Sequence, residues 1–162
     1  FEAFQHNDTD FTNRINFPIR DMSGKIIAFQ GRHTGNGVPK YKFSPPGAKI
    51  PLFPRVSPRH GEVVLVEGLF DMLNLHDKGI DNAICCFGTN NINEDKLNIL
   101  RMQNVHQIAV FFDGDEPGQK AAQNVKSNNL LALISYHLHS GLGKNGSISI
   151  TYHIFLSFPC IV

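Results

Sequence analysis

Three short apolar runs in the middle of the chain predict buried β-strands. The runs at residues 63–66, 83–87 and 108–112 are rich in Val, Ile, Phe and Cys and are too short for a packed helix. Each run is followed by Gly, or by an acid and then Gly, which is typical of a sharp turn at the end of a strand. The sequence therefore places polar side chains at the ends of buried strands.

Amphipathic segments separate these runs and predict helices. Leucines at helical spacing predict helices at residues 69–78 and 94–102, with Gly79 as the C-cap of the first, and a third helix begins at Glu116. Strands and helices thus alternate over about 65 residues, and this alternation predicts a parallel α/β sheet with right-handed crossovers.

The N-terminal part of the chain has a different pattern. Residues 14–20 and 25–32 alternate apolar and polar positions around the turn Asp21-Met22-Ser23-Gly24, which predicts a β-hairpin. Five prolines within residues 45–61 predict a linker. We therefore expect a small basic, mainly-β subdomain at residues 1–60, an α/β domain at residues 61–127 and a divergent C-terminal segment at residues 128–162.

The C-terminal segment carries almost no charge. It holds Lys144 and no Asp or Glu. Alternation at residues 148–154 predicts one strand, and the apolar, uncharged stretch is a candidate aggregation site. Its pattern assigns no function to it.

The net charge of +1 hides an asymmetry between the two main parts. Residues 1–60 hold nine Lys and Arg against four Asp and Glu, whereas residues 61–127 hold five against ten. A basic part joined to an acidic part suits a protein that binds polyanions on one side and metal ions on the other. Chance segregation of surface charge would give the same counts, so the asymmetry alone assigns no function.

Composition narrows the class of protein further. An apolar fraction of 41% and a charged fraction of 18% are typical of a globular protein. The three cysteines, Cys85, Cys86 and Cys160, form no Cys-x-x-Cys pair, which argues against a zinc or redox site and favours a reducing compartment. No run of 18 apolar residues is present, so the sequence predicts no membrane span.

Four carboxylates follow two of the predicted strands. Glu67 and Asp71 follow the first strand. Asp113 and Asp115 follow the third. Because parallel strands end at one edge of a sheet, these acids are expected to meet there, where they would repel one another unless a divalent cation lay between them. Oxygen ligands favour Mg²⁺ or Mn²⁺, so the sequence predicts a metal site for phosphoryl chemistry, in which Glu67 is a ligand or a general base.

Other polar groups are candidates for binding phosphate and nucleic acid. Gly88 and Thr89 follow the second strand and are predicted to offer backbone N–H groups to phosphate. Basic residues interleaved with Phe and Tyr in the N-terminal part suit contacts with phosphates and unstacked bases, although a solvated β-sheet face would carry the same residue types. These residues are Arg14, Arg20, Arg32, Lys40 and Lys42.

Two separate blocks of sequence resemble known families. Val-Glu-Gly-Leu-Phe-Asp at 66–71 and Phe-Asp-Gly-Asp-Glu-Pro-Gly-Gln-Lys-Ala-Ala at 112–122 are similar to the two signatures of the Toprim fold, shared by bacterial-type primases, topoisomerases and some nucleases. Asn-Arg-Ile-Asn-Phe-Pro-Ile-Arg-Asp at 13–21 and Pro-Lys-Tyr-Lys-Phe-Ser-Pro at 39–45 resemble the basic subdomain that precedes Toprim in DnaG-type primases. The resemblance covers roughly residues 11–126.

This resemblance implies the catalytic core of a DNA primase, a nucleotidyltransferase that joins ribonucleoside triphosphates into short RNA primers on single-stranded DNA. It implies template or nucleotide contacts by Arg14, Arg32 and Lys40. It also implies a replicative helicase as partner and a place in the bacterial cytoplasm, or in the host cytoplasm for a phage protein. The residues that it implies for Mg²⁺ or Mn²⁺ are Glu67, Asp71, Asp113 and Asp115, of which Glu67, Asp113 and Asp115 are the catalytic candidates.

The chain departs from the DnaG pattern in three ways. No zinc-binding module precedes the matched part, the early part of the catalytic subdomain would lie before residue 1, and no Asp-x-Asp motif follows residue 126. Two alternatives therefore stay open. One is a Toprim nuclease or topoisomerase. A topoisomerase would need a nucleophilic tyrosine, and the candidates are Tyr41, Tyr136 and Tyr152. The other is a non-catalytic module that binds single-stranded nucleic acid.

Overall fold

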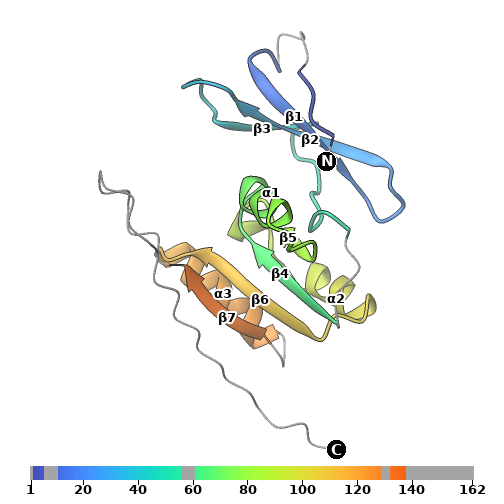
Figure 1. The fold of residues 1–162 in the computed structure, drawn as a ribbon, viewed down its shortest axis with the longest axis vertical. Helices are drawn as coiled ribbons and strands as arrows, with labels where there is room; N and C mark the ends of the chain where they lie inside the picture. Colours follow the sequence, from blue (N-terminus) through green and yellow to red (C-terminus); the bar gives the residue numbers. More distant parts are fainter. Residues whose placement is uncertain (1, 6–10, 56–60, 129–131, 138–162) are drawn as a thin grey trace, which may run out of the picture. The chain divides into compact units, whose positions relative to one another are not determined.

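The structure is a computed structural model that describes residues 2–5, 11–55, 61–128 and 132–137. The chain divides into two compact units, residues 1–55 and residues 56–162. Each unit is built on its own β-sheet, as Figure 1 shows.

The N-terminal unit is a three-stranded antiparallel sheet in the order β1-β2-β3. Its strands are β1 (Arg14–Arg20), β2 (Ile26–His33) and β3 (Tyr41–Ser44). The predicted turn joins β1 to β2: the Asp21 Oδ1 atom accepts the Ser23 N–H at 2.8 Å and the Lys25 N–H at 3.0 Å, and Gly24 has a φ of 85° that favours glycine. The hairpin prediction is confirmed.

One face of this sheet forms the core of the N-terminal unit. Phe17, Ile19 and Ala28 are buried at alternating positions of β1 and β2. Ile50 and Phe53, which follow β3 in the proline-rich stretch, are buried as well. The proline-rich stretch therefore places apolar side chains at buried positions.

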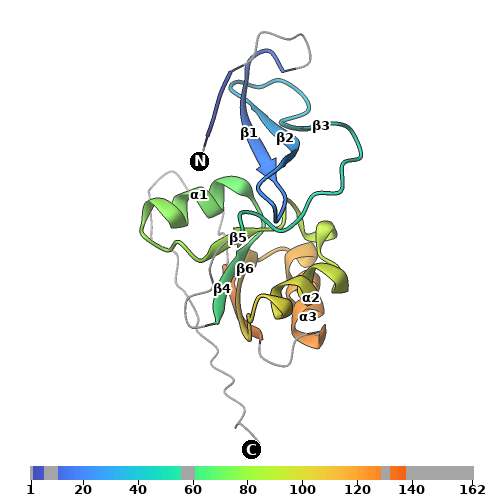
Figure 2. The same ribbon diagram turned by 90° about the vertical axis from the view of Figure 1, so that its right-hand side faces the viewer.

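The C-terminal unit is a parallel four-stranded sheet in the order β5-β4-β6-β7. Its strands are β4 (Glu62–Val66), β5 (Ala83–Cys85), β6 (Gln107–Asp113) and β7 (Ala132–His137). Its helices are α1 (Leu69–Asp77), the 3₁₀ helix η1 (Thr89–Asn91), α2 (Glu94–Met102) and α3 (Glu116–Asn128). Figure 2 shows α1 on one face of the sheet and α2 and α3 on the other, which confirms the α/β prediction.

Parallel pairing brings the carboxyl ends of the central strands together. Val66 at the end of β4 aligns with Cys85 of β5 and with Phe111 of β6. The sheet also continues past residue 127, because β7 pairs with β6. The strand predicted at 148–154 lies outside the described residues.

Burial explains why the helices form where they do. Leu69 and Met72 of α1 and Leu97 and Leu100 of α2 are buried, so each helix packs one apolar stripe against the sheet. The sequence pattern picked out Leu69 but not Met72, which is fully buried. Within the described residues, no helix combines the length and the apolar character needed to span a membrane.

Two substitutions two residues apart in α2, on different faces of the helix, test this packing. Leu97 is 1% exposed and Ile99 is 42% exposed. We expect Leu97→Ala to lower the free energy of unfolding by about 2–5 kcal/mol, and Ile99→Ala by less than about 1 kcal/mol. Urea denaturation followed by circular dichroism measures both. Equal losses would contradict the buried stripe.

Candidate functional site

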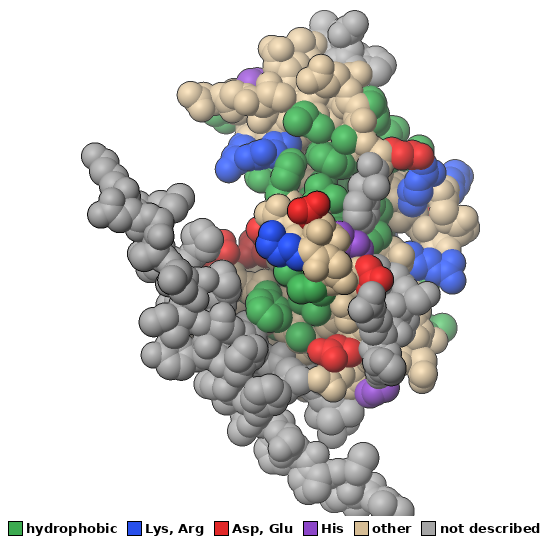
Figure 3. Space-filling view, viewed as in Figure 1, with side chains coloured by type: hydrophobic (Ala, Val, Ile, Leu, Met, Phe, Trp, Pro, Cys, Tyr) green, Lys and Arg blue, Asp and Glu red, His purple; other side chains and the backbone are tan. Residues whose placement is uncertain are grey.

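Four carboxylates lie around the carboxyl ends of β4 and β6, the two central strands of the C-terminal unit. Glu67 directly follows β4, and Asp113 is the last residue of β6. Asp71 lies in the first turn of α1, and Asp115 immediately precedes α3. We call these four residues the carboxylate edge. Acidic side chains on the face drawn in Figure 3 are exposed beside this end of the sheet.

The charges of the three aspartates act on the Glu67 carboxyl. Burial raises the pKa of the half-buried Glu67 carboxyl, and the nearby charges of Asp113, Asp115 and Asp71 raise it further. Only the Thr89 backbone N–H, which donates to this carboxylate, acts in the opposite direction among the main causes. Glu67 is therefore influenced by acids as far away in the sequence as Asp115, 48 residues later.

Two of the carboxylates are oriented by helix N-termini. The Asp71 Oδ2 atom accepts the Gly68 N–H at 3.2 Å at the start of α1. The Asp115 Oδ1 atom accepts the Gly118 N–H at 2.9 Å at the start of α3. Such capping contacts satisfy helix N–H groups and hold the acids beside the positive ends of the helix dipoles.

Gly118 explains the spacing of the Asp-Gly-Asp-x-x-Gly segment. A Cβ atom at this position would lie 2.1 Å from the Asp113 carbonyl oxygen, which no side chain tolerates. Glycine therefore lets the first turn of α3 pack directly against the end of β6. That close approach keeps Asp113 and Asp115 on the same edge.

The chemistry of the donors fits a hard divalent cation. All four side chains offer carboxylate oxygens, the ligands that Mg²⁺ and Mn²⁺ prefer, and the charged side chains that act most strongly on Glu67 are all acidic. Within the described ranges, however, no three Asp, Glu, His or Cys side chains form a group arranged to hold a metal ion. Binding would thus require the acids to shift from their present positions.

Gly88 and Thr89, the predicted phosphate donors, both point their N–H groups at Glu67. The Gly88 N–H donates to the Glu67 carbonyl at 3.1 Å, and the Thr89 N–H donates to the Glu67 carboxylate. Gly88 has a φ of 105°, which requires glycine. In this structure the two donors fix Glu67 to the neighbouring strand end.

Arg14 is buried inside the N-terminal unit. Its Nη2 atom donates to the Pro39 carbonyl at 2.7 Å, and its Nη1 atom donates to the Gly31 and Lys40 carbonyls, both at 3.3 Å. It is 6% exposed. The guanidinium therefore holds the turn that leads into β3.

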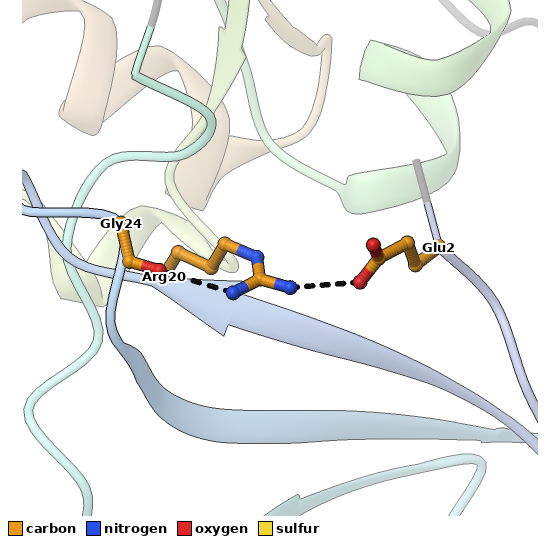
Figure 4. Close-up of polar contacts among 3 residues, drawn as sticks. All are labelled: Glu2, Arg20 and Gly24. Carbon is orange, nitrogen blue, oxygen red and sulfur yellow. Dashed lines mark hydrogen bonds and ion pairs between the residues drawn. The ribbon is translucent and has the colours of Figure 1, made fainter.

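The other predicted basic residues are more accessible. Arg20 donates to the Gly24 carbonyl at 3.0 Å and pairs with Glu2 at 2.7 Å, as Figure 4 shows. Arg32 is half-buried on β2. Lys40 is exposed and its Nζ atom lies 5.7 Å from the centroid of the Tyr41 ring.

Lys42, the last of the five predicted basic residues, also lies over an aromatic ring. Its Nζ atom lies 5.5 Å from the centroid of the Phe11 ring. Two neighbouring lysines thus each lie over an aromatic ring, at a distance typical of cation–π contacts.

One residue that the sequence did not single out lies close behind the carboxylate edge. Lys96, in the first turn of α2, is half-buried and donates to the Asn91 carbonyl at 2.6 Å. Burial lowers the pKa of its ammonium group. A single Lys in a polar helix start carries no sequence signal for this role.

Two family models match the chain, one for each unit. The model described as the N-terminal domain of the DNA primase catalytic core matches residues 2–50. The Toprim domain model matches residues 61–136, which include β7. A parallel α/β domain of the Toprim class is therefore preceded by the subdomain that accompanies it in primases.

Curated relatives and solved structures agree with these matches. DNA primase of Pseudomonas aeruginosa is 38% identical over 124 residues, covering 69% of this chain and 18% of the relative. DNA primase of Geobacillus stearothermophilus is 36% identical over 126 residues, covering 69% and 20%. A solved DNA primase domain from Pseudomonas aeruginosa has a TM-score of 0.63 and 33% identity, covering 84% of this chain and 48% of that one.

The chain belongs to the DnaG-type DNA primase family, as part of the catalytic core. The Escherichia coli primase catalytic core has a TM-score of 0.64 and 26% identity over 81% of this chain and 46% of its own. The chain spans about a fifth of the length of the curated relatives it matches, so the activity of a complete primase is not assigned to it by likeness alone.

The raised pKa of Glu67 predicts a pH-dependent stability. A carboxyl whose folded pKa lies above its ordinary value stabilises the fold at low pH, and that contribution is lost as pH rises through the folded pKa. Without divalent metal, we expect the contribution of Glu67 to the free energy of unfolding to fall with rising pH above the ordinary glutamate value of 4.5. Urea denaturation between about pH 4 and about pH 8 measures this.

The matched variants are Glu67→Gln and Glu62→Gln, at opposite ends of the same strand. Glu67→Gln should remove part of the pH slope, because an amide does not titrate, whereas Glu62→Gln should leave that part in place. A slope unchanged by Glu67→Gln would show that this carboxyl is not crowded by the others.

Proposed function

We propose that this chain contributes metal-dependent RNA primer synthesis to a DNA primase. The observation that carries the proposal is that three aspartates raise the pKa of Glu67 at the end of a central strand in a Toprim-class sheet. The match of the N-terminal unit to the primase catalytic core supports it, because a nuclease or topoisomerase would not require that subdomain. The reaction is the attack of a ribonucleotide 3′-hydroxyl on the α-phosphate of a ribonucleoside triphosphate.

Toprim primases are metal-dependent as a class, and we propose Mg²⁺, or Mn²⁺, held by Glu67, Asp71, Asp113 and Asp115. A divalent metal there would favour ionisation of the attacking hydroxyl and stabilise charge on the transferring phosphate. Asp113 and Asp115 carry the ligand role. Glu67 either binds metal or accepts the proton of the hydroxyl, since its raised pKa makes it a stronger base than an ordinary glutamate.

We propose that the N-terminal unit binds the single-stranded template. A DnaG primase catalytic domain solved with single-stranded DNA has a TM-score of 0.61 and 25% identity to this chain. Lys40 and Lys42, each over an aromatic ring, combine a cation for phosphate with a stacking platform for bases. Arg20 and Arg32 belong to the same proposed surface, and Arg14 supports it by holding the turn before β3.

The remaining partners rest on the family alone. We propose a replicative helicase as partner and the cytoplasm as location, because the relatives are DNA primases.

A non-catalytic binding module remains the second candidate, for one specific reason. No Asp or Glu occurs within residues 128–162, and the register places His137, not an acid, opposite Asp113. Strong binding of single-stranded DNA together with no calorimetric heat of Mg²⁺ binding would favour that candidate over the enzyme.

Primer synthesis tests the metal role directly. In a chimera in which residues 11–126 replace the matching stretch of the Pseudomonas aeruginosa primase, we expect Asp113→Asn to lower the rate roughly 100-fold or more, because a ligand charge is lost. Asp77→Asn, at the far end of α1, is the control and should keep the activity. Full activity of Asp113→Asn would exclude the metal role; an inactive chimera before any substitution would favour the binding module.

Salt dependence tests the template surface. Lys40→Ala should weaken binding of single-stranded DNA and lower the slope of log affinity against log salt by about one unit, because one phosphate contact is lost. Lys25→Ala, on the β1–β2 turn, is the exposed control. A slope that is the same in Lys40→Ala and the unaltered chain would remove Lys40 from the surface.

A further inference from the structure

Among the main causes that shift the pKa of Glu67, only a contact from η1 favours the ionised carboxylate. The Thr89 N–H donates to the Glu67 carboxylate, and the Gly88 N–H donates to the Glu67 carbonyl. Both donors lie at the start of η1, a single turn of 3₁₀ helix. Because so short a helix makes few bonds of its own, something else must hold it in place.

Asn91, at the far end of η1, connects the turn to β5. Its backbone N–H donates to the Gly88 carbonyl at 3.0 Å, and its side-chain Nδ2 atom donates to the Cys86 carbonyl at 2.8 Å. The Cys86 Sγ atom in turn lies 3.7 Å from the Glu67 carbonyl oxygen. Asn91 therefore ties η1 to the same backbone segment that borders Glu67.

Lys96 holds Asn91 from the other side. Its Nζ atom donates to the Asn91 carbonyl at 2.6 Å and also to the Asn91 Oδ1 atom. The lysine backbone is itself fixed, because its N–H donates to the Asn93 Oδ1 atom at 3.0 Å in the cap of α2. A half-buried ammonium anchored on a capped helix is a rigid support, and charge-assisted hydrogen bonds are stronger than neutral ones.

We infer that Lys96 is a positioning residue for the carboxylate edge, which acts through Asn91 and η1 to keep the Thr89 N–H on Glu67. Lys96 does not act as a direct counter-charge, because the charged groups that influence Glu67 most are Asp113, Asp115 and Asp71. The neighbouring Cys86 thiol is no counter-charge for Lys96 either, because burial raises its pKa to about 12. The inference rests on the proposed function only where it concerns metal binding.

Amide hydrogen exchange on the metal-free 162-residue chain tests the positioning without any activity measurement. Lys96→Met keeps the length of the side chain but removes its charge and its donors. We expect the Thr89 and Asn91 amides to exchange at least about tenfold faster in this variant. Lys126→Met, on the exposed last turn of α3, is the control and should leave both rates unchanged. Unchanged exchange in Lys96→Met would overturn the inference.

Calorimetric titration with Mn²⁺ tests the link to the metal. Lys96→Met should bind Mn²⁺ about tenfold more weakly, because a residue that positions a metal ligand without touching the metal is lost. Tighter Mn²⁺ binding by Lys96→Met would show that Lys96 only repels the cation. Unchanged Mn²⁺ binding together with faster amide exchange would show that Lys96 has only a local structural role. Either result would overturn the inference. If the unaltered chain binds no Mn²⁺, the proposed function fails, while the exchange rates still decide whether Lys96 fixes η1.

Two further variants keep the test decisive if Lys96→Met does not fold. Lys96→Arg retains charge and donors, so it should restore most of the protection of Thr89. Asn91→Ala removes the receiving side chain, and it should speed exchange at Thr89 by a similar factor to Lys96→Met. Slow exchange at Thr89 in Asn91→Ala would contradict the proposed route.

Discussion

Repulsion among carboxylates at one edge of a parallel sheet is the constraint on which the C-terminal unit depends. Burial and three neighbouring negative charges raise the pKa of Glu67, so the fold disfavours the ionised form of that carboxyl. Two helix N-termini and the η1 turn offset part of the repulsion among the carboxylates with N–H donors. The metal site that we propose would relieve this repulsion once the acids had moved close enough to share a cation.

The two units carry different chemical groups, and this division suits the polymerisation on a template that we propose. The acids belong to strand ends of the parallel sheet, where backbone geometry is rigid. The exposed Lys40 and the half-buried Lys42 belong to β3 and to the turn before it, which Arg14 holds from inside. Rigid support is needed where metal geometry matters. Contacts with the phosphate backbone of a template tolerate more freedom, since they are largely electrostatic.

Much of this arrangement could be predicted from the sequence, because it follows from local periodicity. The apolar run before Asp113 predicted β6, and parallel strands necessarily bring Glu67 and Asp113 to one edge. The distinction between Arg14 and Lys40 could not be predicted, since both lie in one basic block and only three-dimensional contacts bury the arginine. Lys96 was missed for the same reason: its partners become neighbours only after η1 has folded.

The most direct measurement of the central claim is paramagnetic broadening of backbone amide signals by Mn²⁺ in the 162-residue chain. A cation shared by the carboxylate edge should broaden Gly68, after β4, and Gly114, after β6, at the same Mn²⁺ concentration. Broadening at only one of the two strand ends, or at scattered surface acids such as Asp77 with neither glycine affected, would contradict a shared metal site.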